Sequence, residues 1–487
     1  MFNSIIFNLG ARTSIRGRSS GAYRIATELR SQGWDIEVVD FFYYWSLEEL
    51  KQLSISRIND DTKFIGFSHI FTEWPQLAED FCCWLKDTYP EIVILFGSNT
   101  YQNLNSKYID YYLAGYGELG IIKFLSWKFG NGERPIITPI DNNKVLQCLQ
   151  YYTAAPWKNP IIIYEDRDFI LPYEWLGIEF SRGCKFKCAY CNFPMLGVKG
   201  DWTRDADNFE QQLRDAYDRF GITRYIVSDE TFNDRSEKIS KFADAVQSTG
   251  IDVFFNAHIR GDLLVSRPQD KEELLRMGVR SHFYGLESFN YESAKVCGKG
   301  MQSEKLKQGM LDIKDYFTKH GNKRYRGTIA LIAGLPYESE ESIIESYNWL
   351  IENWSTQSVM INPLDIYRST AVGTKSVFEE NFEKFGYREM ANTDGWDISK
   401  LARGPQFVKD VLIWENDHTN YFRIRQIVTD LQKNPNQNFY RIAFNLAADL
   451  SGKGLDHSLS IKDNDCDEEE HRIFASQYIK KKLNHGS

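Results

Sequence analysis

This sequence of 487 residues lacks several features that would set its class. No apolar run reaches about 18 residues, the length expected of a membrane-spanning helix. The first residues, Met1 to Ser4, lead into a strand-like run without the basic and apolar segments of a secretory signal. Cysteine is sparse, with eight residues and no ladder of spacings typical of a disulfide framework. These absences predict a cytoplasmic protein without a membrane anchor.

An excess of basic residues is also missing. The formal net charge is -9, which argues against a general surface for nucleic acid or another polyanion. The run Lys480 to Lys482 has no aromatic residues interleaved, so it predicts a charged tail rather than a nucleic-acid site. The acidic run Asp463 to Glu470 predicts solvated surface. With 42% hydrophobic residues, the length predicts a globular protein with more than one domain.

Three of the eight cysteines lie close together. Cys184, Cys188 and Cys191 are separated by four and three residues. Cysteine thiolates hold iron–sulfur clusters, and three local ligands on a four-iron cube would leave one iron open to a small molecule. A structural zinc ion would ordinarily need a fourth Cys or His, and the residues from Asn192 to Met195 supply none. A zinc-stabilised binding scaffold stays as an alternative from a non-enzymatic class.

The CxxxCxxC spacing, with the aromatic Tyr190 before the last cysteine, resembles the radical S-adenosylmethionine (SAM) enzymes. The resemblance implies that the three cysteines are the catalytic and metal-binding residues, holding a [4Fe-4S] cluster whose fourth iron is chelated by SAM. It implies Tyr190 at the SAM site. It also implies cleavage of SAM to a 5′-deoxyadenosyl radical, with an electron supplied by a reducing partner such as flavodoxin or ferredoxin.

Residues 1–130 alternate strand-like and helical runs. Strands are expected at residues 4–8, 36–39, 64–67 and 92–96, and a helix is expected at Ala22–Arg30, before Gly33. Buried apolar strands that alternate with helices predict an α/β domain with a doubly wound parallel sheet. Ligands of such sheets bind at the carboxyl ends of the strands.

Small and polar residues stand at those strand ends. The first loop, Gly10 to Arg18, is not GxGxxG, so a dinucleotide is not indicated. The remaining ends resemble the Rossmann-like cobalamin-binding domain found ahead of many radical SAM domains. The resemblance implies cobalamin contacts from Ser68, Gly97, Ser98, Gly115, Gly117 and Glu118. The DxHxxG motif of many cobalamin proteins is missing, so two alternatives stay open: cobalamin bound without a protein histidine, or an empty domain that gates the substrate.

Residues 131–172 are punctuated by Pro135, Pro139 and Pro156, which predicts a connector with a short strand near Pro160–Tyr164. Over residues 173–375 the alternation restarts, with six strand-like runs at 176–180, 224–228, 252–256, 279–284, 326–331 and 358–364. Six right-handed strand–helix repeats predict a partial (β/α)6 TIM-like barrel with its active residues at the carboxyl ends of the strands. Residues 376–487 are expected to form a mainly helical extension, with apolar stripes from Tyr421 and from Phe439.

Charged residues follow the second and third of these six runs. Either Asp229 or Glu230 is expected to accept the SAM ammonium group, the alternative being a helix N-cap. Arg260 is expected to bind the SAM carboxylate, the alternative being an ion pair with Asp262.

The fourth and fifth runs end in further elements that resemble the family. Glu287 and Ser288 resemble the ribose-contacting element, in which a carboxylate accepts hydroxyl groups. Leu335 and Pro336 resemble the turn beside the adenine. Cys297, shortly after the fourth run, is a candidate reactive thiol, provided that it is exposed and has a lowered pKa.

These patterns predict a radical SAM enzyme with a cobalamin-type domain, which uses the 5′-deoxyadenosyl radical to methylate an unactivated carbon if cobalamin is bound. A non-methylating radical SAM enzyme that performs a rearrangement or cyclisation is the main alternative. A methylthiotransferase is disfavoured, because only Cys82, Cys83 and Cys148 precede the barrel and the first two point in different directions on one predicted helix.

Overall fold

The computed structural model describes residues 3–9, 17–69, 74–98, 104, 106–151, 161–172, 174–193, 202–321, 325–354, 357–368, 375–391, 411–434 and 463–485. The chain divides into two compact units. The first comprises Met1–Ile178, Asp207–Arg224 and Asn464–Ser487, and the second Glu179–Ala206 and Tyr225–Asp463. Within the described ranges, each helix is too short or too polar to cross a bilayer.

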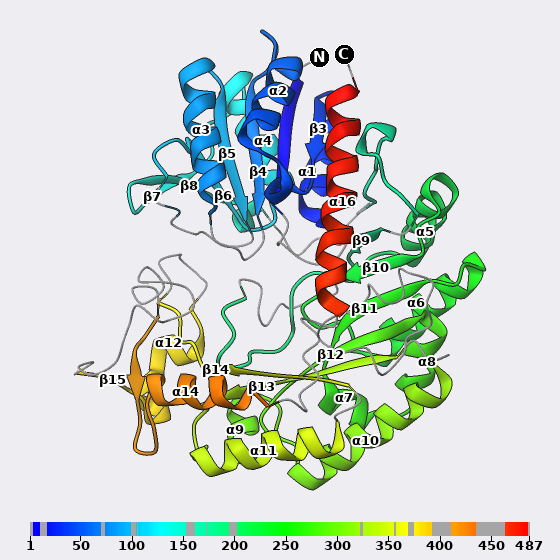
Figure 1. The fold of residues 1–487 in the computed structure, drawn as a ribbon, viewed down its shortest axis with the longest axis vertical. Coiled ribbons are helices and arrows are strands. Elements are labelled where there is room, and N and C mark those ends of the chain that lie inside the picture. Colours follow the sequence, from blue (N-terminus) through cyan, green and yellow to red (C-terminus); the bar gives the residue numbers. More distant parts are fainter. Residues whose placement is uncertain are drawn as a thin grey trace. The chain divides into compact units, whose positions relative to one another are not determined.

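The first unit is built on a seven-stranded sheet with the order β3-β1-β4-β5-β6-β8-β7 (Figure 1). All neighbouring strands are parallel except β7 and β8, which are antiparallel. The chain moves from β1 to one side and then back across it to β4. Because crossovers are right-handed, α1 and α2 lie on opposite faces. The prediction of a doubly wound parallel sheet is confirmed.

The elements of the first unit are β1 (Asn3–Leu9), β2 (Gly17–Arg18), α1 (Ser20–Ser31), β3 (Asp35–Val39), η1 (Phe42–Tyr44), α2 (Leu47–Arg57), β4 (Phe64–His69), α3 (Gln76–Thr88), β5 (Val93–Ser98), β6 (Tyr111–Ala114), α4 (Glu118–Phe129), β7 (Ile137–Ile140), β8 (Asn143–Gln147), η2 (Cys148–Tyr151), η3 (Asp166–Asp168), β9 (Trp175–Ile178), α5 (Ala206–Phe220) and α16 (Asp463–Asn484). Residues 131–172, expected to be a connector, thus contribute β7 and β8 to the sheet. Residues 161–164, where a short strand was expected, are not in a strand.

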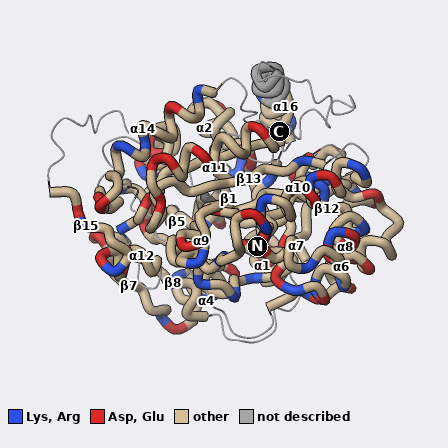
Figure 2. Tube along the Cα trace, turned by 90° about the horizontal axis from the view of Figure 1, so that it is seen from below, with Lys and Arg blue, Asp and Glu red and all other residues tan. Residues whose placement is uncertain are grey.

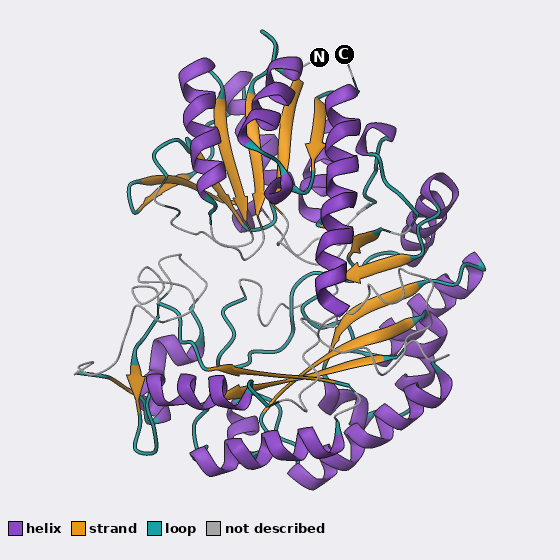
Figure 3. Cartoon of the chain, viewed as in Figure 1, coloured by secondary structure: helices purple, strands orange, loops and turns teal. Residues whose placement is uncertain are grey.

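The second unit carries strands β10 to β14, which lie in chain order within one sheet. The three neighbouring pairs from β11 to β14 are parallel, and helices follow the strands along the chain (Figure 3). Together with β9, all six strands expected from the alternation are present. This order is typical of a β/α barrel, and the predicted α/β class is confirmed.

The elements of the second unit are β10 (Arg224–Val227), α6 (Ser236–Thr249), β11 (Phe254–Ile259), α7 (Gly261–Ser266), α8 (Asp270–Met277), β12 (Val279–Glu287), α9 (Tyr291–Val296), α10 (Ser303–His320), β13 (Arg326–Ala333), α11 (Glu340–Asn353), β14 (Ser358–Pro363), α12 (Val377–Asn381), η4 (Phe382–Phe385), β15 (Arg388–Glu389), β16 (Trp414–Glu415) and α14 (Tyr421–Leu431).

The side chains of strand β12 alternate between the two faces of the second unit's sheet. His282 and Tyr284 point to one face, where Phe317 of α10 packs against His282. Burial lowers the pKa of His282 to about 4, so the ring is neutral there. The intervening Phe283 points to the other face and contacts the ring of His258 at 4.9 Å between centroids. The inner face therefore presents aromatic side chains just below the strand ends.

The extension after β14 is partly helical. The apolar stripe of α14, which includes Tyr421, Ile424 and Val428, is buried as expected. Strands β15 and β16 form a short antiparallel pair that the prediction of a mainly helical region did not include. The second expected stripe, from Phe439, lies outside the described residues.

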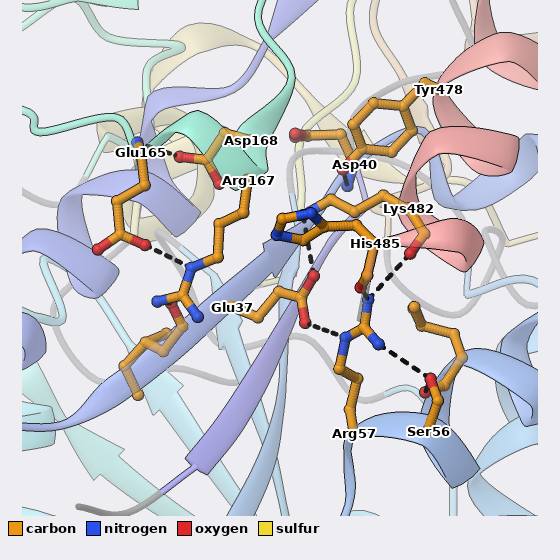
Figure 4. A network of polar contacts seen from close by, with 12 residues as sticks. Glu37, Asp40, Ser56, Arg57, Glu165, Arg167, Asp168, Tyr478, Lys482 and His485 are labelled. Atoms are coloured by element: carbon orange, nitrogen blue, oxygen red, sulfur yellow. Dashed lines mark hydrogen bonds and ion pairs between the residues drawn. The ribbon is translucent and has the colours of Figure 1, made fainter. Parts of the chain in front are cut away.

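Helix α16 packs in the first unit and corrects one prediction. Lys482, expected in a charged tail, is fully buried and forms an ion pair with Glu37 at 3.1 Å (Figure 4). Glu37 also forms an ion pair with Arg57 at 2.9 Å. Burial alone would raise the pKa of Glu37, but the charges of Lys482 and Arg57 lower it below its usual value. The prediction for Lys482 was wrong because Lys482 follows Tyr478 by four residues on the buried face of the helix.

Arg18 is the second buried charge of this unit. Its guanidinium group lies 2.5 Å from Glu174 and 2.8 Å from Asp40. The hydroxyl of Tyr478 accepts a hydrogen bond from the backbone N–H of Asp40 at 3.0 Å. These contacts fix the segment after β1, the segment before β9 and the terminal helix to one another.

Replacing Lys482 with Met is expected to lower the free energy of unfolding by about 3 kcal/mol, because Glu37 then stays buried with only Arg57 as its partner. Lys480→Met is the matched control, since Lys480 is exposed on the same helix and its loss should cost less than about 0.5 kcal/mol. Urea unfolding of both variants measures the difference. Equal losses would contradict a structural role for the buried ion pair.

Candidate active site

The cysteine loop follows β9 and begins the second unit. Cys184, Cys188 and Cys191 are all free thiols, with Cys184 buried and the other two partly exposed. A turn closes the loop, in which the N–H of Cys191 donates to the carbonyl of Cys188 at 3.0 Å. The carbonyl of Ala189 accepts a hydrogen bond from the N–H of Phe378, so the region after β14 supports this turn.

The thiols lie near cationic side chains. Burial raises the pKa of Cys188, and the charges of Lys299 and Arg260 oppose that rise. Burial also raises the pKa of Cys191 to about 12, so this thiol is protonated until a metal binds. Within the described ranges, no three His, Cys, Asp or Glu side chains are already grouped for metal binding. The donor set and the nearby positive charges nevertheless fit an anionic, thiolate-bound cluster.

The two adjacent carboxylates after β10 are in different situations. Asp229 is 3% exposed and accepts hydrogen bonds from the N–H of Phe180 at 2.7 Å and from the hydroxyl of Ser181 at 2.6 Å. Burial raises its pKa to about 6. Glu230 is exposed. Asp229 therefore supports the residues just before the cysteine loop, and Glu230 is the carboxylate that is accessible to a ligand.

Arg260 is held on several sides at the end of β11. Its guanidinium group forms an ion pair with Asp262 at 2.6 Å and lies 3.9 Å from the ring centroid of Phe186. The side chain of Asn233 accepts a hydrogen bond from the N–H of Arg260 and donates one to the carbonyl oxygen of Arg260. The Nη1 atom is buried and has no hydrogen-bond partner among the described residues. The alternative ion pair with Asp262 is thus present, yet one nitrogen is left for an anionic group.

Glu287 joins the cysteine loop to the end of β12. It accepts hydrogen bonds from the hydroxyl of Tyr190 at 2.6 Å and from Lys299 at 2.5 Å. Lys299 also donates to the carbonyl of Gly285. The backbone of Glu287 has a φ of +67°, and the register of β12 shifts between Gly285 and Glu287. A positive φ in a non-glycine residue is uncommon and is often found at functional sites.

Sequence reasoning missed Lys299. The only local indication is that this lysine stands between Gly298 and Gly300, two residues after Cys297. Its partner Glu287 lies twelve residues away in the chain.

Ser288 and the turn that contains Leu335 and Pro336 are joined by one buried carboxylate, which bonds Ser288 and the N–H of Leu335. Glu338 accepts hydrogen bonds from the hydroxyl of Ser288 at 2.5 Å and from the N–H groups of Gly334 and Leu335 at 3.1 Å each. Burial raises the pKa of Glu338 to about 7. The structure thus brings the fourth and fifth expected SAM elements together, although the hydroxyl of Ser288 is used within the protein.

Cys297 does not have the properties of a reactive thiol. It is fully buried, and burial raises its pKa well above the usual value. Reactive cysteines need exposure and a lowered pKa.

The residues expected to contact cobalamin lie along neighbouring strand ends of the first unit. Ser68 on β4 pairs in register with Gly97 on β5, and the N–H of Gly115 donates to the carbonyl of Ser98 at 2.9 Å. Among the described residues, a Cβ atom added at Gly97 would meet only the carbonyl of Phe67, at the ordinary contact distance of 3.8 Å. Glycine at this strand end fits the close approach of a flat ring system.

The other two expected contacts open helix α4. Gly117 is its N-cap residue, and Glu118 is buried in an ion pair with Arg24 at 3.2 Å. Glu118 therefore holds α4 to α1. Most of the first loop, residues 10–16, lies outside the described residues.

Comparison with known proteins matches residues 178–350 to the family model of the Radical SAM superfamily. A curated relative, the anaerobic magnesium-protoporphyrin IX monomethyl ester cyclase of Synechocystis sp., is 21% identical over 290 residues, which cover 54% of this chain and 57% of the relative. The chain thus spans little more than half the length of that relative.

Two solved structures share most of the chain's fold. The radical S-adenosylmethionine methyltransferase TsrM from Kitasatospora setae, solved with tryptophan substrate and a SAM analogue, has a TM-score of 0.65 at 13% identity, covering 97% of this chain and 100% of its own. The cobalamin-dependent SAM radical enzyme OxsB, solved with aqua-cobalamin and SAM, has a TM-score of 0.55 at 15% identity, covering 98% and 67%. Residues 178–350 of this chain are therefore similar to the Radical SAM superfamily.

Proposed function

We propose that this protein is a cobalamin-using radical SAM enzyme that methylates an unactivated carbon atom. The observation that carries the proposal is the contact of Tyr190, inside the three-cysteine loop, with Glu287 at the end of β12. When bound, a [4Fe-4S] cluster would supply the electron that cleaves SAM, and cobalamin would supply the methyl group. The residues of the chain bind and orient these groups and exclude water.

Cys184, Cys188 and Cys191 would hold the cluster through their thiolates. Because the described part of the chain holds no group of three such ligands, the cysteine side chains would rotate toward the cluster as it binds, with loss of the thiol protons. Lys299 and Arg260 beside Cys188 would offset the negative charge of the thiolates.

Three side chains and one turn would hold SAM. Glu230 would accept its ammonium group, and the unpartnered Nη1 of Arg260 would donate to its carboxylate. Glu287, oriented by Tyr190 and Lys299, would accept a ribose hydroxyl. The turn at Leu335 and Pro336, fixed by Glu338, would lie beside the adenine.

Two observations support cobalamin in the first unit. Small residues, Ser68 and Gly97, occupy the adjacent ends of β4 and β5. TsrM and OxsB, whose folds match along nearly all of this chain, have both been solved with cobalamin. A methyltransferase fits this pair of domains better than an enzyme that uses the cluster alone.

A radical cyclase or rearrangement enzyme is the second candidate. The curated relative over 54% of the chain is named as a cyclase. The two candidates share the cluster and SAM residues, and they differ in whether a methyl group reaches the product.

Cys188→Ala should lose nearly all iron after anaerobic reconstitution and should form no 5′-deoxyadenosine, because two thiolates cannot replace three. Cys297→Ala is the matched control, since Cys297 is buried outside the loop and should keep both properties. Iron analysis and chromatography of the products measure the outcome. Undiminished deoxyadenosine from Cys188→Ala, or one bound zinc in the wild type, would refute the cluster.

Glu230→Gln should weaken SAM binding about tenfold or more, because a charge-assisted hydrogen bond contributes about 1.5–3 kcal/mol. Asp229→Asn should instead lower the melting temperature and the iron content, since Asp229 supports Phe180 and Ser181. Equilibrium binding of SAM to both variants, beside thermal unfolding, separates the roles. A larger loss of SAM affinity in Asp229→Asn would reverse the assignment.

Gly97→Leu should abolish retention of hydroxocobalamin after desalting, because a bulky side chain at the strand end blocks the close approach of a ring system. Cluster content and SAM cleavage should persist in this variant. Incubation with cell extract and SAM that carries a labelled methyl group should place label in a product with the wild type and not with Gly97→Leu. Wild-type product without label would favour the cyclase.

A further inference from the structure

The inner face of the second unit's sheet contains an exposed histidine in a buried strand. Strand β11 is buried along its length except at His258, whose side chain is exposed. β11 lies between β10 and β12, and parallel strands in such a central position are normally covered on both faces. Desolvation by the surrounding protein nevertheless lowers the pKa of His258. A side chain that is both exposed and desolvated faces a recess, so the inner face is open to a ligand at this point.

The imidazole ring of His258 has polar atoms that the protein does not use. Among the described residues, no group forms a hydrogen bond with either ring nitrogen. The ring lies against Phe283, with 4.9 Å between the centroids and 52° between the planes. A neutral imidazole has one nitrogen that donates a hydrogen bond and one that accepts. The ring pair His258–Phe283 therefore offers aromatic surface together with one unused donor and one unused acceptor.

The register of the sheet places this ring pair beside a residue that is expected to bind SAM. His258 pairs with Phe283 across the neighbouring strands β11 and β12. Gly285 follows Phe283 by two residues, on the same face of β12 and about 7 Å further along the strand. A Cβ atom added at Gly285 would lie 2.7 Å from the carboxylate of Glu287. The ring pair and this carboxylate therefore occupy neighbouring positions on one face.

The strands around the ring pair carry little charge. β11 and β14 contain no Lys, Arg, Asp or Glu, whereas cations and carboxylates are mixed along helices α6, α8 and α10 of the same unit (Figure 2). Arg326 of β13 pairs in register with Ser281 of β12 and is buried. Asn256 donates a hydrogen bond to Ser281 at 2.7 Å, and Met360 of β14 is partly exposed. The exposed part of these strands is therefore aromatic and apolar with few polar groups, which is typical of a small-molecule site.

We propose that the ring pair His258–Phe283 is the substrate subsite and that it takes a flat, uncharged aromatic ring carrying a hydrogen-bond donor. The inference rests on the proposed function, because it places the substrate beside SAM bound at Glu287. Aromatic side chains favour stacked or edge-on contacts with a flat ring. The accepting nitrogen of His258 would bind the donor and so fix how the ring is turned. The ring pair binds and orients the substrate, and no bond to it is made or broken.

The test compares two probes on the full chain loaded with its cluster and SAM, without oxygen. 2-Naphthol has an O–H donor, and 2-methoxynaphthalene has the same rings without one. The wild type should bind 2-naphthol about fivefold more tightly, because of one additional hydrogen bond. His258→Phe keeps an aromatic ring without the accepting nitrogen and should remove this preference. Phe283→Leu should weaken both probes about fivefold. His320→Phe is the matched control and should change neither affinity, since His320 is exposed on α10 and lies 4.8 Å from the ring centroid of Tyr316.

Equal wild-type affinities for the two probes, or no binding of either, would overturn the subsite and leave the proposed function intact. A preference for 2-naphthol that persists in His258→Phe would do the same. The Kd for SAM, measured in the same variants, should stay within about twofold of wild type. A loss of SAM affinity in His258→Phe with unchanged probe binding would assign the ring pair to the SAM site instead. A loaded wild type that cleaves no SAM with dithionite would refute the proposed function, and the probe affinities would still decide whether the subsite exists.

Discussion

The hydrogen bond between Tyr190 and Glu287 is the constraint on which the second unit's site depends. Tyr190 belongs to the cysteine loop and Glu287 ends β12, 97 residues later. A loop with three thiols is useful only if it lies in a fixed position over the strand ends, and this contact supplies that position. The buried carboxylate is stable there because Lys299 balances its charge at 2.5 Å.

Buried carboxylates recur at the other strand ends and serve the same purpose. Asp229 bonds two consecutive residues before the cysteine loop, and Glu338 bonds the backbone of the turn after β13. Each replaces missing backbone partners at a place where the chain leaves a strand. Exposed Glu230 and the free nitrogen of Arg260 are then the polar groups left over for ligands. The buried carboxylates therefore support the backbone, and the exposed carboxylate is available to bind a ligand.

The strands were predictable because each is an apolar run that its own sequence reveals. Order along the chain then placed the cysteines, Arg260 and Glu287 at strand ends. Lys299 and Lys482 were not predictable in the same way. The partner of Lys482 lies 445 residues away, and nothing near either lysine indicates a buried carboxylate. Lysines are almost never fully buried unless they form an ion pair. A lysine with no partner nearby in the sequence is therefore predicted to lie on the surface. The different roles of Asp229 and Glu230 were hidden for the same reason, since only packing separates neighbours in the sequence.

Burial also explains why cations on the two sides of the cysteine loop should differ in function. Lys299 and Arg260 are buried, so their charges act on Cys188 with little screening by solvent or salt. Lys185 is exposed, so its influence on a buried group is weak, while its field extends into solvent. Buried cations can stabilise thiolate charge, and exposed ones can attract a partner.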